Sequence, residues 1–270
     1  MKTVVTIREL RTALQGIRAG RTVGLVPTMG ALHDGHLSLI ASAREENDIV
    51  IATVFINPAQ FGTGEDLTSY PRDDEHDAAL AAEHGVDLLF SPAAGELYPE
   101  GFQTWVEVEE LGRTLEGSAR PGHFRGVATV CLKLFNIARP DRAYFGQKDA
   151  QQAAVVNRMV RDLDLDLTIR VLPTVRDADG LALSSRNAYL SPEERVRALA
   201  LPRALRAGLE AYRGGAHADA VARTILAGQP GLEREYVEIV RLDDRLVLAA
   251  AVRVGGTRLI DNVVLEGDPQ

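Results

Sequence analysis

The chain has 270 residues, a formal net charge of −8 and 46% hydrophobic residues, which suits one large or two modest globular domains. The acidic balance disfavours a nucleic-acid partner, because such binders usually present a basic face to phosphates. No apolar stretch reaches the ~20 residues needed to cross a bilayer, and no secretory signal is present, so we expect a cytoplasmic protein without membrane contact. The single cysteine, Cys131, has the helical spacing of a core residue and excludes an intrachain disulfide.

Short apolar runs alternate with amphipathic segments over the first two-thirds of the sequence. The run at 49–56 is rich in β-branched residues, as in strands that are covered on both faces. This alternation predicts an α/β fold with a doubly wound, Rossmann-like parallel sheet over residues 1–174, and ligands at the carboxyl ends of its strands. The expected strands are 22–26, 49–56, 86–90, 143–145 and 167–172, and the expected helices begin near 36 and span 73–84, 127–138 and 149–163.

Residues 175–270 change pattern and predict a smaller α+β domain. Ser191 is a capping residue followed by proline and two acids, so we expect a helix from there to about residue 212. A shorter helix is expected at 216–226. Turn residues at 243–244 and 255–256 separate three strand-like runs and predict hairpins. The runs are 234–240, 246–252 and 258–264.

The most informative segment is Pro-Thr-Met-Gly-Ala-Leu-His-Asp-Gly-His at 27–36, which joins the first strand-like run to a helix. Glycine lets the main chain approach a ligand closely, and the N–H groups of a helix start favour an anion. His33 and His36 lie three residues apart, so both can point into one crevice. The segment therefore predicts a nucleotide phosphate site. A bare His-x-x-His more often marks one surface and one core histidine, so the interpretation depends on the surrounding residues.

The His-x-Gly-His signature resembles the phosphate-binding motif of the nucleotidylyl transferase superfamily. Together with the preceding Pro-Thr-Met-Gly, it is similar to the pantothenate synthetase family in particular. Four later segments match that family in the same order, and the ordered series is far more specific than any one motif. These segments are 57–61, 120–127, 146–152 and 179–187, and the resemblance extends to Arg195.

The resemblance implies ATP-dependent condensation of (R)-pantoate with β-alanine, which gives pantothenate, AMP and pyrophosphate through a pantoyl-adenylate intermediate in coenzyme A biosynthesis. A carboxylate must then approach an anionic α-phosphate, so the site needs donors and cations placed for the transition state. The resemblance implies His33, His36 and Lys148 as catalytic residues. His36 is the better candidate for a donor to the developing charge, and Lys148 acts as a point charge on the phosphates.

The resemblance also implies a set of ATP-binding residues. Asp149 would accept hydrogen bonds from ribose hydroxyls, and the smaller domain would close over the nucleotide. Val175 and Leu183 would line the adenine pocket, while Ser184, Ser185 and Arg186 would hold the β- and γ-phosphates. Gln147 stands where glutamate is common in the family and Ala150 where an aromatic is common, so we expect altered loop packing and nucleotide affinity. The full set is Met29, Gly30, Ala31, Leu32, His33, Asp34, Gly35, His36, Gly146, Gln147, Lys148, Asp149, Val175, Leu183, Ser184, Ser185 and Arg186.

Gln60 and Gln152 match the family's pantoate-binding glutamines, whose amides both donate and accept hydrogen bonds. Gln60 is also a candidate contact of β-alanine. Mg²⁺ is expected to neutralise the triphosphate, with Asp77 as its candidate ligand. Asp77 shares a predicted helix face with Asp73 and Asp74, for which complementarity to the helix dipole is the alternative explanation. The family also implies a homodimer.

Two alternatives remain open at this point. Another nucleotidylyl transferase would keep the nucleotide on its product, whereas the ligase frees AMP in equal amount with an amide. A nucleotide-sensing module would bind ATP without turning it over. Retention of both histidines, Lys148 and both glutamines argues against the sensing module.

Overall fold

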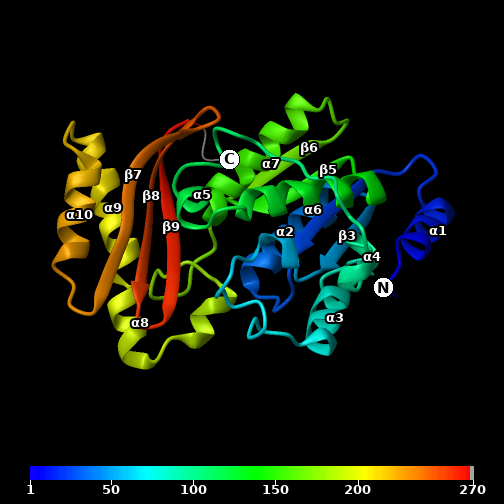
Figure 1. Cartoon of the computed structure of the whole chain (residues 1–270), viewed down its shortest axis with the longest axis horizontal. Coiled ribbons are helices and arrows are strands. Elements are labelled where there is room, and N and C mark those ends of the chain that lie inside the picture. The colour runs from blue at the N-terminus through cyan, green and yellow to red at the C-terminus, as the bar shows by residue number, and fades with distance from the viewer. Residues whose placement is uncertain (268–270) are drawn as a thin grey trace. The chain divides into compact units, whose positions relative to one another are not determined.

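The protein is described by a computed structural model that covers residues 1–267 (Figure 1). It divides into two compact units, one of residues 1–145 and 151–172 and the other of residues 146–150 and 173 onward. Within residues 1–267, no helix combines the length and the apolar character that a membrane span requires.

The larger unit contains a six-stranded parallel sheet in the order β1-β4-β3-β2-β5-β6. From β2 the order follows the chain through β3 and β4 on one side and through β5 and β6 on the other, as the doubly wound prediction requires, and β1 is added at the β4 edge. The strands are β1 (Lys2–Val4), β2 (Val23–Thr28), β3 (Ile49–Val54), β4 (Leu88–Phe90), β5 (Arg142–Gly146) and β6 (Thr168–Leu172). The helices are α1 (Ile7–Ile17), α2 (Asp34–Glu46), α3 (Asp74–Glu83), α4 (Ala94–Leu97), α5 (Glu116–Ala119), α6 (His123–Ala138) and α7 (Ala150–Asp162).

Both faces of this sheet are covered, because the side chains of β2 and β3 alternate between two hydrophobic clusters. Leu25 and Ile51 belong to the cluster that includes α1, α6 and α7. Val26 and Ala52 belong to the cluster that includes α2 and α3. Cys131 is buried in the first cluster, as its spacing predicted.

Two elements at the N-terminus were not predicted from the sequence. β1 has three residues and pairs with β4, which is too short for a periodic signal. α1 begins with a capping box in which Thr6 and Glu9 satisfy each other's main-chain N–H groups. That signature was readable in the sequence, and Leu10 and Leu14 fix the buried face of the helix.

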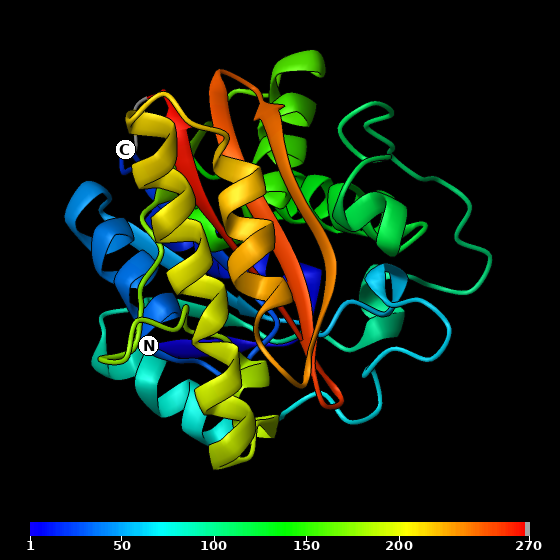
Figure 2. The ribbon, with the colours of Figure 1, turned by 90° about the vertical axis from the view of Figure 1, so that its left-hand side faces the viewer.

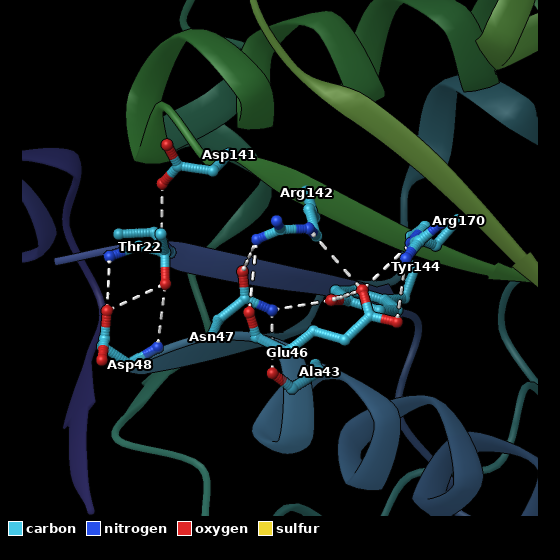
Figure 3. Close-up of polar contacts among 10 residues, drawn as sticks. Thr22, Ala43, Glu46, Asn47, Asp48, Asp141, Arg142, Tyr144 and Arg170 are labelled. Carbon is cyan, nitrogen blue, oxygen red and sulfur yellow. Dashed lines mark hydrogen bonds and ion pairs between the residues drawn. The ribbon is translucent and has the colours of Figure 1, made fainter.

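A polar network lies between the carboxyl end of α2 and the strands β5 and β6 (Figure 3). Tyr144 accepts a hydrogen bond from Asn47 (Oη–Nδ2, 2.6 Å) and donates one to Glu46 (Oη–Oε2, 3.0 Å). Glu46 also pairs with Arg170 and Arg142. The hydrogen bond from Arg170, stronger than the opposing effect of burial, lowers the pKa of Glu46. The network ties the end of α2 to both strands.

The smaller unit is built on an antiparallel sheet, β7-β8-β9, as predicted. Its strands are β7 (Leu232–Leu242), β8 (Arg245–Val254) and β9 (Thr257–Glu266). The two turns contain Asp243 and Gly255 at positive φ, 54° and 58°. Helices α9 (Ala200–Arg213) and α10 (Ala218–Ala227) cover one face of the sheet (Figure 2). Leu205, Ala222 and Leu248 contribute to the core between them.

The single helix expected from Ser191 to about residue 212 is wrong, because the structure has two helices there. α8 (Pro192–Ala198) begins with the predicted serine cap, which forms a capping box with Glu194. The chain turns at Leu199, and α9 then begins. Pro202 lies at the third position of α9, where its missing N–H costs no intrahelical bond, whereas inside one long helix it would remove one.

Candidate active site

The loop between β2 and α2 has a tightly specified main chain. Gly30 has φ of 87° and Ala31 has φ of 50°. A Cβ on Gly30 would lie 2.8 Å from Asp77 Oδ2 and 3.0 Å from Val54 Cγ1, so only glycine fits there without displacement. The N–H of Gly30 donates to Thr28 Oγ1 at 3.1 Å. The conformation of the loop is therefore specified by contacts within the protein.

The two histidines of this loop have their protons placed by the main chain. His33 is the N-cap of α2 and accepts from the Gly35 N–H at Nδ1 (3.1 Å). His36 Nδ1 accepts from the His33 N–H (3.4 Å). An accepting Nδ1 carries no proton, so in each neutral ring the proton lies on Nε2. The rings stack with centroids 4.1 Å apart. The amino end of α2 thus carries two imidazole N–H donors beside each other.

Asp77 supports this loop from α3. Its Oδ2 accepts from the Ala31 N–H at 2.8 Å and its Oδ1 from the Leu32 N–H at 2.7 Å. Burial raises the pKa of Asp77, and the two main-chain donors oppose that shift. Both oxygens already face main-chain N–H groups, so this setting argues against the metal role expected for Asp77. Within residues 1–267, no group of three or more His, Cys, Asp or Glu residues is arranged to hold a metal ion.

Gln60 ends η1 (Pro58–Gln60), the short helix that follows β3. Asn57 caps this turn, since its Oδ1 accepts from the Ala59 N–H at 3.3 Å. Its Nδ2 therefore donates to the Gly126 carbonyl at 3.2 Å and to Gln60 Oε1 at 3.0 Å. Because Asn57 Nδ2 donates to Gln60 Oε1, the Gln60 Nε2 group points away from Asn57. It donates to Met29 Sδ at 3.1 Å. Gln60 is presented as a hydrogen-bond donor beside the histidine loop.

The two adjacent glutamines at the start of α7 have different settings. Gln151 is buried and holds the loop before α5, donating to the carbonyls of Leu111 (2.7 Å) and Thr114 (2.8 Å) and accepting from the Glu116 N–H (3.0 Å). Gln152 is half-buried on the first turn of the helix. Gln151 is therefore engaged by the loop before α5, and Gln152 stays the substrate candidate expected from the sequence.

The smaller unit holds the segment that contains Lys148, residues 146–150. Asn262 on β9 donates from Nδ2 to the carbonyls of Gln147 and Lys148, both at 2.9 Å. The Gln147 side chain donates to Asn262 Oδ1 at 2.9 Å and accepts from Arg245 Nη1 at 2.6 Å. Gln147 is thus one half of an amide pair that holds the loop. Asn262 was missed in the sequence, because a lone asparagine in a strand carries no local signal.

A hairpin in the smaller unit contains the residues expected to bind adenine and the β- and γ-phosphates. The Leu183 N–H donates to the Val175 carbonyl at 3.0 Å, so these two residues face each other across the hairpin. Ser184 caps η3 (Ser185–Tyr189), accepting from the Arg186 N–H at 3.3 Å. Arg195 on α8 fixes the hairpin through Asp177 and Asp179. The structure therefore joins the adenine and phosphate candidates on one short segment.

The comparisons with known proteins agree with one another. A family model described as pantoate-beta-alanine ligase matches residues 2–264. A pantothenate synthetase of Moorella thermoacetica is 53% identical, over 98% of this chain and 99% of the relative. The solved structure of pantothenate synthetase from Thermus thermophilus has a TM-score of 0.94 at 49% identity, covering 99% of this chain and 100% of the other. The pantoate-beta-alanine ligase of Francisella tularensis, complexed with beta-gamma ATP and beta-alanine, has a TM-score of 0.85 at 35% identity, with 100% of both chains covered.

Proposed function

The chain belongs to the pantoate–β-alanine ligase family, and from that membership we propose how its residues divide the work of the reaction. The enzyme joins pantoate to β-alanine and consumes ATP, with AMP and pyrophosphate as the other products. The observation that carries the proposal is that His33 and His36 each accept a main-chain N–H at Nδ1, which assigns the proton of each neutral ring to Nε2 at the amino end of α2.

We propose that these two N–H groups bind the phosphates of ATP. Attack by the pantoate carboxylate on the α-phosphorus forms the acyl–phosphate bond and breaks the bond to pyrophosphate. Negative charge grows on the phosphoryl oxygens during this step, and preorganised donors stabilise that charge more than they stabilise the ground state. The amino end of α2 adds main-chain N–H groups, whose partial positive charge also favours a bound phosphate.

The proposed role of Gln60 is to donate from Nε2 to pantoate, with Gln152 as the second contact. Asn57 supports this assignment because it occupies Gln60 Oε1, so the substrate would meet the Nε2 end, where one N–H is directed at Met29 Sδ and the second is the proposed donor. A neutral donor orients an acid substrate without the Coulomb attraction of a cation, so the carboxylate stays reactive. The β-alanine amine then attacks the adenylate carbonyl as the free base and expels AMP.

For the nucleotide, we propose that Lys148 neutralises phosphate charge and that Asp149 accepts from the ribose hydroxyls. Ser184, Ser185 and Arg186 bind the β- and γ-phosphates, while Val175 and Leu183 contact adenine. The anchoring of residues 146–150 on β9 and the facing of Val175 and Leu183 support these assignments. We also propose the domain division expected from the sequence, with ATP and pantoate on 1–174 and closure over the nucleotide by 175–270. The segment 146–150 departs from this division, because it belongs to the smaller compact unit.

The proposal also includes Mg²⁺ as the counter-ion of ATP, a homodimer and a cytoplasmic location. No protein ligand to Mg²⁺ is assigned, because Asp77 directs both carboxylate oxygens to main-chain N–H groups. Sedimentation velocity tests the dimer, and cell fractionation tests the location. Removing Mg²⁺ with EDTA should stop turnover if the metal accompanies ATP into the site.

One experiment tests whether adenylation precedes amide formation and whether Lys148 acts in that first step. With ATP and pantoate but no β-alanine, label from pyrophosphate should exchange into ATP, because adenylation alone is reversible. Omission of pantoate should abolish the exchange, and Lys148→Ala should suppress it. Exchange that always requires β-alanine would contradict the stepwise adenylate route. A nucleotide that stays on the product, or ATP binding without turnover, would favour the two alternative activities.

A further inference from the structure

The turn that carries Gln60 is in close contact with the first turns of α6. A Cβ on Gly126 would lie 2.3 Å from the Ala59 carbonyl oxygen and 2.7 Å from Gln60 Cα. Only glycine permits this approach of helix to turn. The turn itself is weakly bonded, since its two main-chain hydrogen bonds, Gln60 N–H to the Asn57 carbonyl and Phe61 N–H to the Pro58 carbonyl, are both 3.3 Å long. The position of Gln60 therefore depends on contacts from outside the turn.

His123, the first residue of α6, provides one of these contacts. Its Nδ1 lies 2.9 Å from the main-chain carbonyl oxygen of Gln60. A carbonyl oxygen only accepts, so Nδ1 carries the proton. In the neutral ring Nε2 is then an acceptor, and it lies 3.2 Å from Arg120 Nη1, which only donates. The neighbours on both sides thus require the same tautomer.

Arg120 is held in turn by Glu65. Its Nε donates to Glu65 Oε1 at 2.8 Å and its Nη2 to Glu65 Oε2 at 2.6 Å, which is a bidentate pair. The Arg120 and Glu65 side chains are only 15% and 23% exposed, so this pair is little screened by solvent. The order Glu65, Arg120, His123, Gln60 carbonyl is a continuous chain of directed hydrogen bonds.

Burial, together with the neighbouring Arg120 cation, keeps His123 neutral. Burial and the Arg120 guanidinium lower the pKa of His123 to about 4, against the opposing effects of the hydrogen bond to the Gln60 carbonyl and of the Glu116 and Glu65 charges. Burial disfavours ionisation of Glu65, but the Arg120 guanidinium outweighs it, and the pKa of Glu65 lies below its usual value. The ring is therefore a neutral donor at Nδ1 at physiological pH, and the pair beside it stays charged.

We propose that His123 is a positioning residue for the acid substrate: its Nδ1–H, oriented by Arg120 and Glu65, holds the Gln60 main chain so that the Gln60 amide meets pantoate. This inference rests on the proposed function, which assigns pantoate to Gln60. His123 itself touches no substrate. His123, on the first turn of α6, thus sets the affinity for pantoate through the position of Gln60.

The first test uses two substitutions of the same residue. His123→Leu removes the shorter of the two hydrogen bonds to the Gln60 carbonyl and leaves only the one from Arg120 Nη2 at 3.5 Å. The KM for pantoate should therefore rise ~10-fold while the KM for ATP stays near its original value. His123→Asn puts an amide donor near the place of Nδ1 and should restore most of the pantoate affinity. His84→Leu is the matched control, because His84 Nδ1 also lies 2.8 Å from a main-chain carbonyl, that of Leu80. A folded His123→Leu enzyme with the original pantoate KM would overturn the proposal.

A double-mutant cycle separates this inference from the assignment on which it rests. If His123 acts through Gln60, His123→Leu should have little further effect on pantoate KM in a Gln60→Ala background. Equal effects in both backgrounds would overturn the positioning role. If Gln60→Ala alone leaves pantoate KM unchanged, the proposed function of Gln60 fails instead.

A spectroscopic measurement on the unsubstituted enzyme covers the case in which His123→Leu does not fold. Long-range ¹H–¹⁵N correlation of ¹⁵N-histidine-labelled protein should show one ring protonated at Nδ1 and unchanged between pH ~6 and 8, where a free imidazole titrates. The same signal should be missing in His123→Asn. A His123 ring that is protonated at Nε2, or that titrates in this range, would contradict the proposed chain of hydrogen bonds.

Discussion

The proton position on each histidine of the loop after β2 is set by a single main-chain N–H, from Gly35 for His33 and from His33 for His36. His33 consequently has two separable roles. Its Nδ1 caps α2, and its Nε2–H is proposed to bind phosphate. A substitution that keeps the cap and removes the distal N–H separates folding from chemistry.

We expect His33→Asn to retain the thermal stability of the enzyme, because asparagine is among the best N-cap residues. Adenylate formation should nevertheless fall by ~10²–10³-fold, the usual effect of losing one donor to a developing oxyanion. Single-turnover measurement of adenylate formation checks the loss of activity, and a thermal unfolding scan checks the retained stability. His33→Ala is the comparison variant and should lose both. Adenylation at the original rate in His33→Asn would exclude the phosphate role.

Gln60 gives a second prediction at the same scale, because Asn57 fixes which end of its amide faces the substrate. Gln60→Glu keeps the size and the oxygen that faces Asn57, but it replaces the Nε2 donor with an acceptor that repels the pantoate carboxylate. The KM for pantoate should rise ~10–100-fold. Gln60→Met, a neutral side chain of similar shape, should be affected less. If Gln60→Glu binds pantoate better than Gln60→Met, then Gln60 faces the substrate with Oε1 and not with Nε2.

At the scale of elements, β9 holds the lysine loop through one side chain. Asn262 is buried and donates to the carbonyls of Gln147 and Lys148. Asn262→Ala removes both donors and also the partner of the Gln147 amide, so the loop loses its defined position. We expect the KM for ATP to rise ~10-fold with the KM for pantoate unchanged. Steady-state kinetics with each substrate varied in turn measures this difference.

Gln229→Ala is the control for that substitution, since Gln229 is an amide of the same unit that pairs with Arg203 and not with the loop. It should leave both KM values unchanged. A pantoate KM that rises together with the ATP KM in Asn262→Ala would indicate a general folding defect, and the specific role of β9 would then be rejected.

At the scale of the whole molecule, the network around Glu46 makes stability depend on pH. Its pKa in the folded protein lies below 4.5, the value expected for the unfolded chain, mainly because Arg170 donates to it. A depressed folded pKa means that the contribution of the carboxylate to stability is complete above pH ~4.5 and is lost as pH falls through the folded value. Acidification should therefore weaken the link between α2 and the two strands β5 and β6.

Glu46→Gln tests this dependence. The variant should be less stable than the original protein at neutral pH, and the difference in unfolding free energy should shrink as the pH falls below ~4.5. Urea unfolding monitored by circular dichroism between pH ~3 and 7 measures it. Glu45→Gln, on an exposed position of the same helix, should show no such convergence. A constant difference across the pH range would exclude the Glu46 carboxylate as its source.

Local patterns in the sequence were enough for the features that depend on near neighbours. The strand-to-helix turn with His33 and His36, the serine cap of α8 and the two hairpins of the smaller unit all follow from residues within a few positions of one another. The order of the family's motifs identified the reaction for the same reason, since each motif is a short segment. β1 is too short for such a signal, and the break at Leu199 was missed because Pro202 was not read as a helix boundary.

The tertiary structure alone decided which residues support the site, because their partners are far apart in the sequence. Asp77 holds main-chain atoms 45 and 46 residues away, and Asn262 holds a loop 114 and 115 residues away. The contact of His123 with Gln60 spans 63 residues. A side chain that binds a distant main-chain group leaves no periodicity or spacing, since any polar residue at that place in the chain looks alike. The sequence by itself therefore determined the reaction, because the motifs that identify it are local, and the fold decided how the groups proposed to perform it are held.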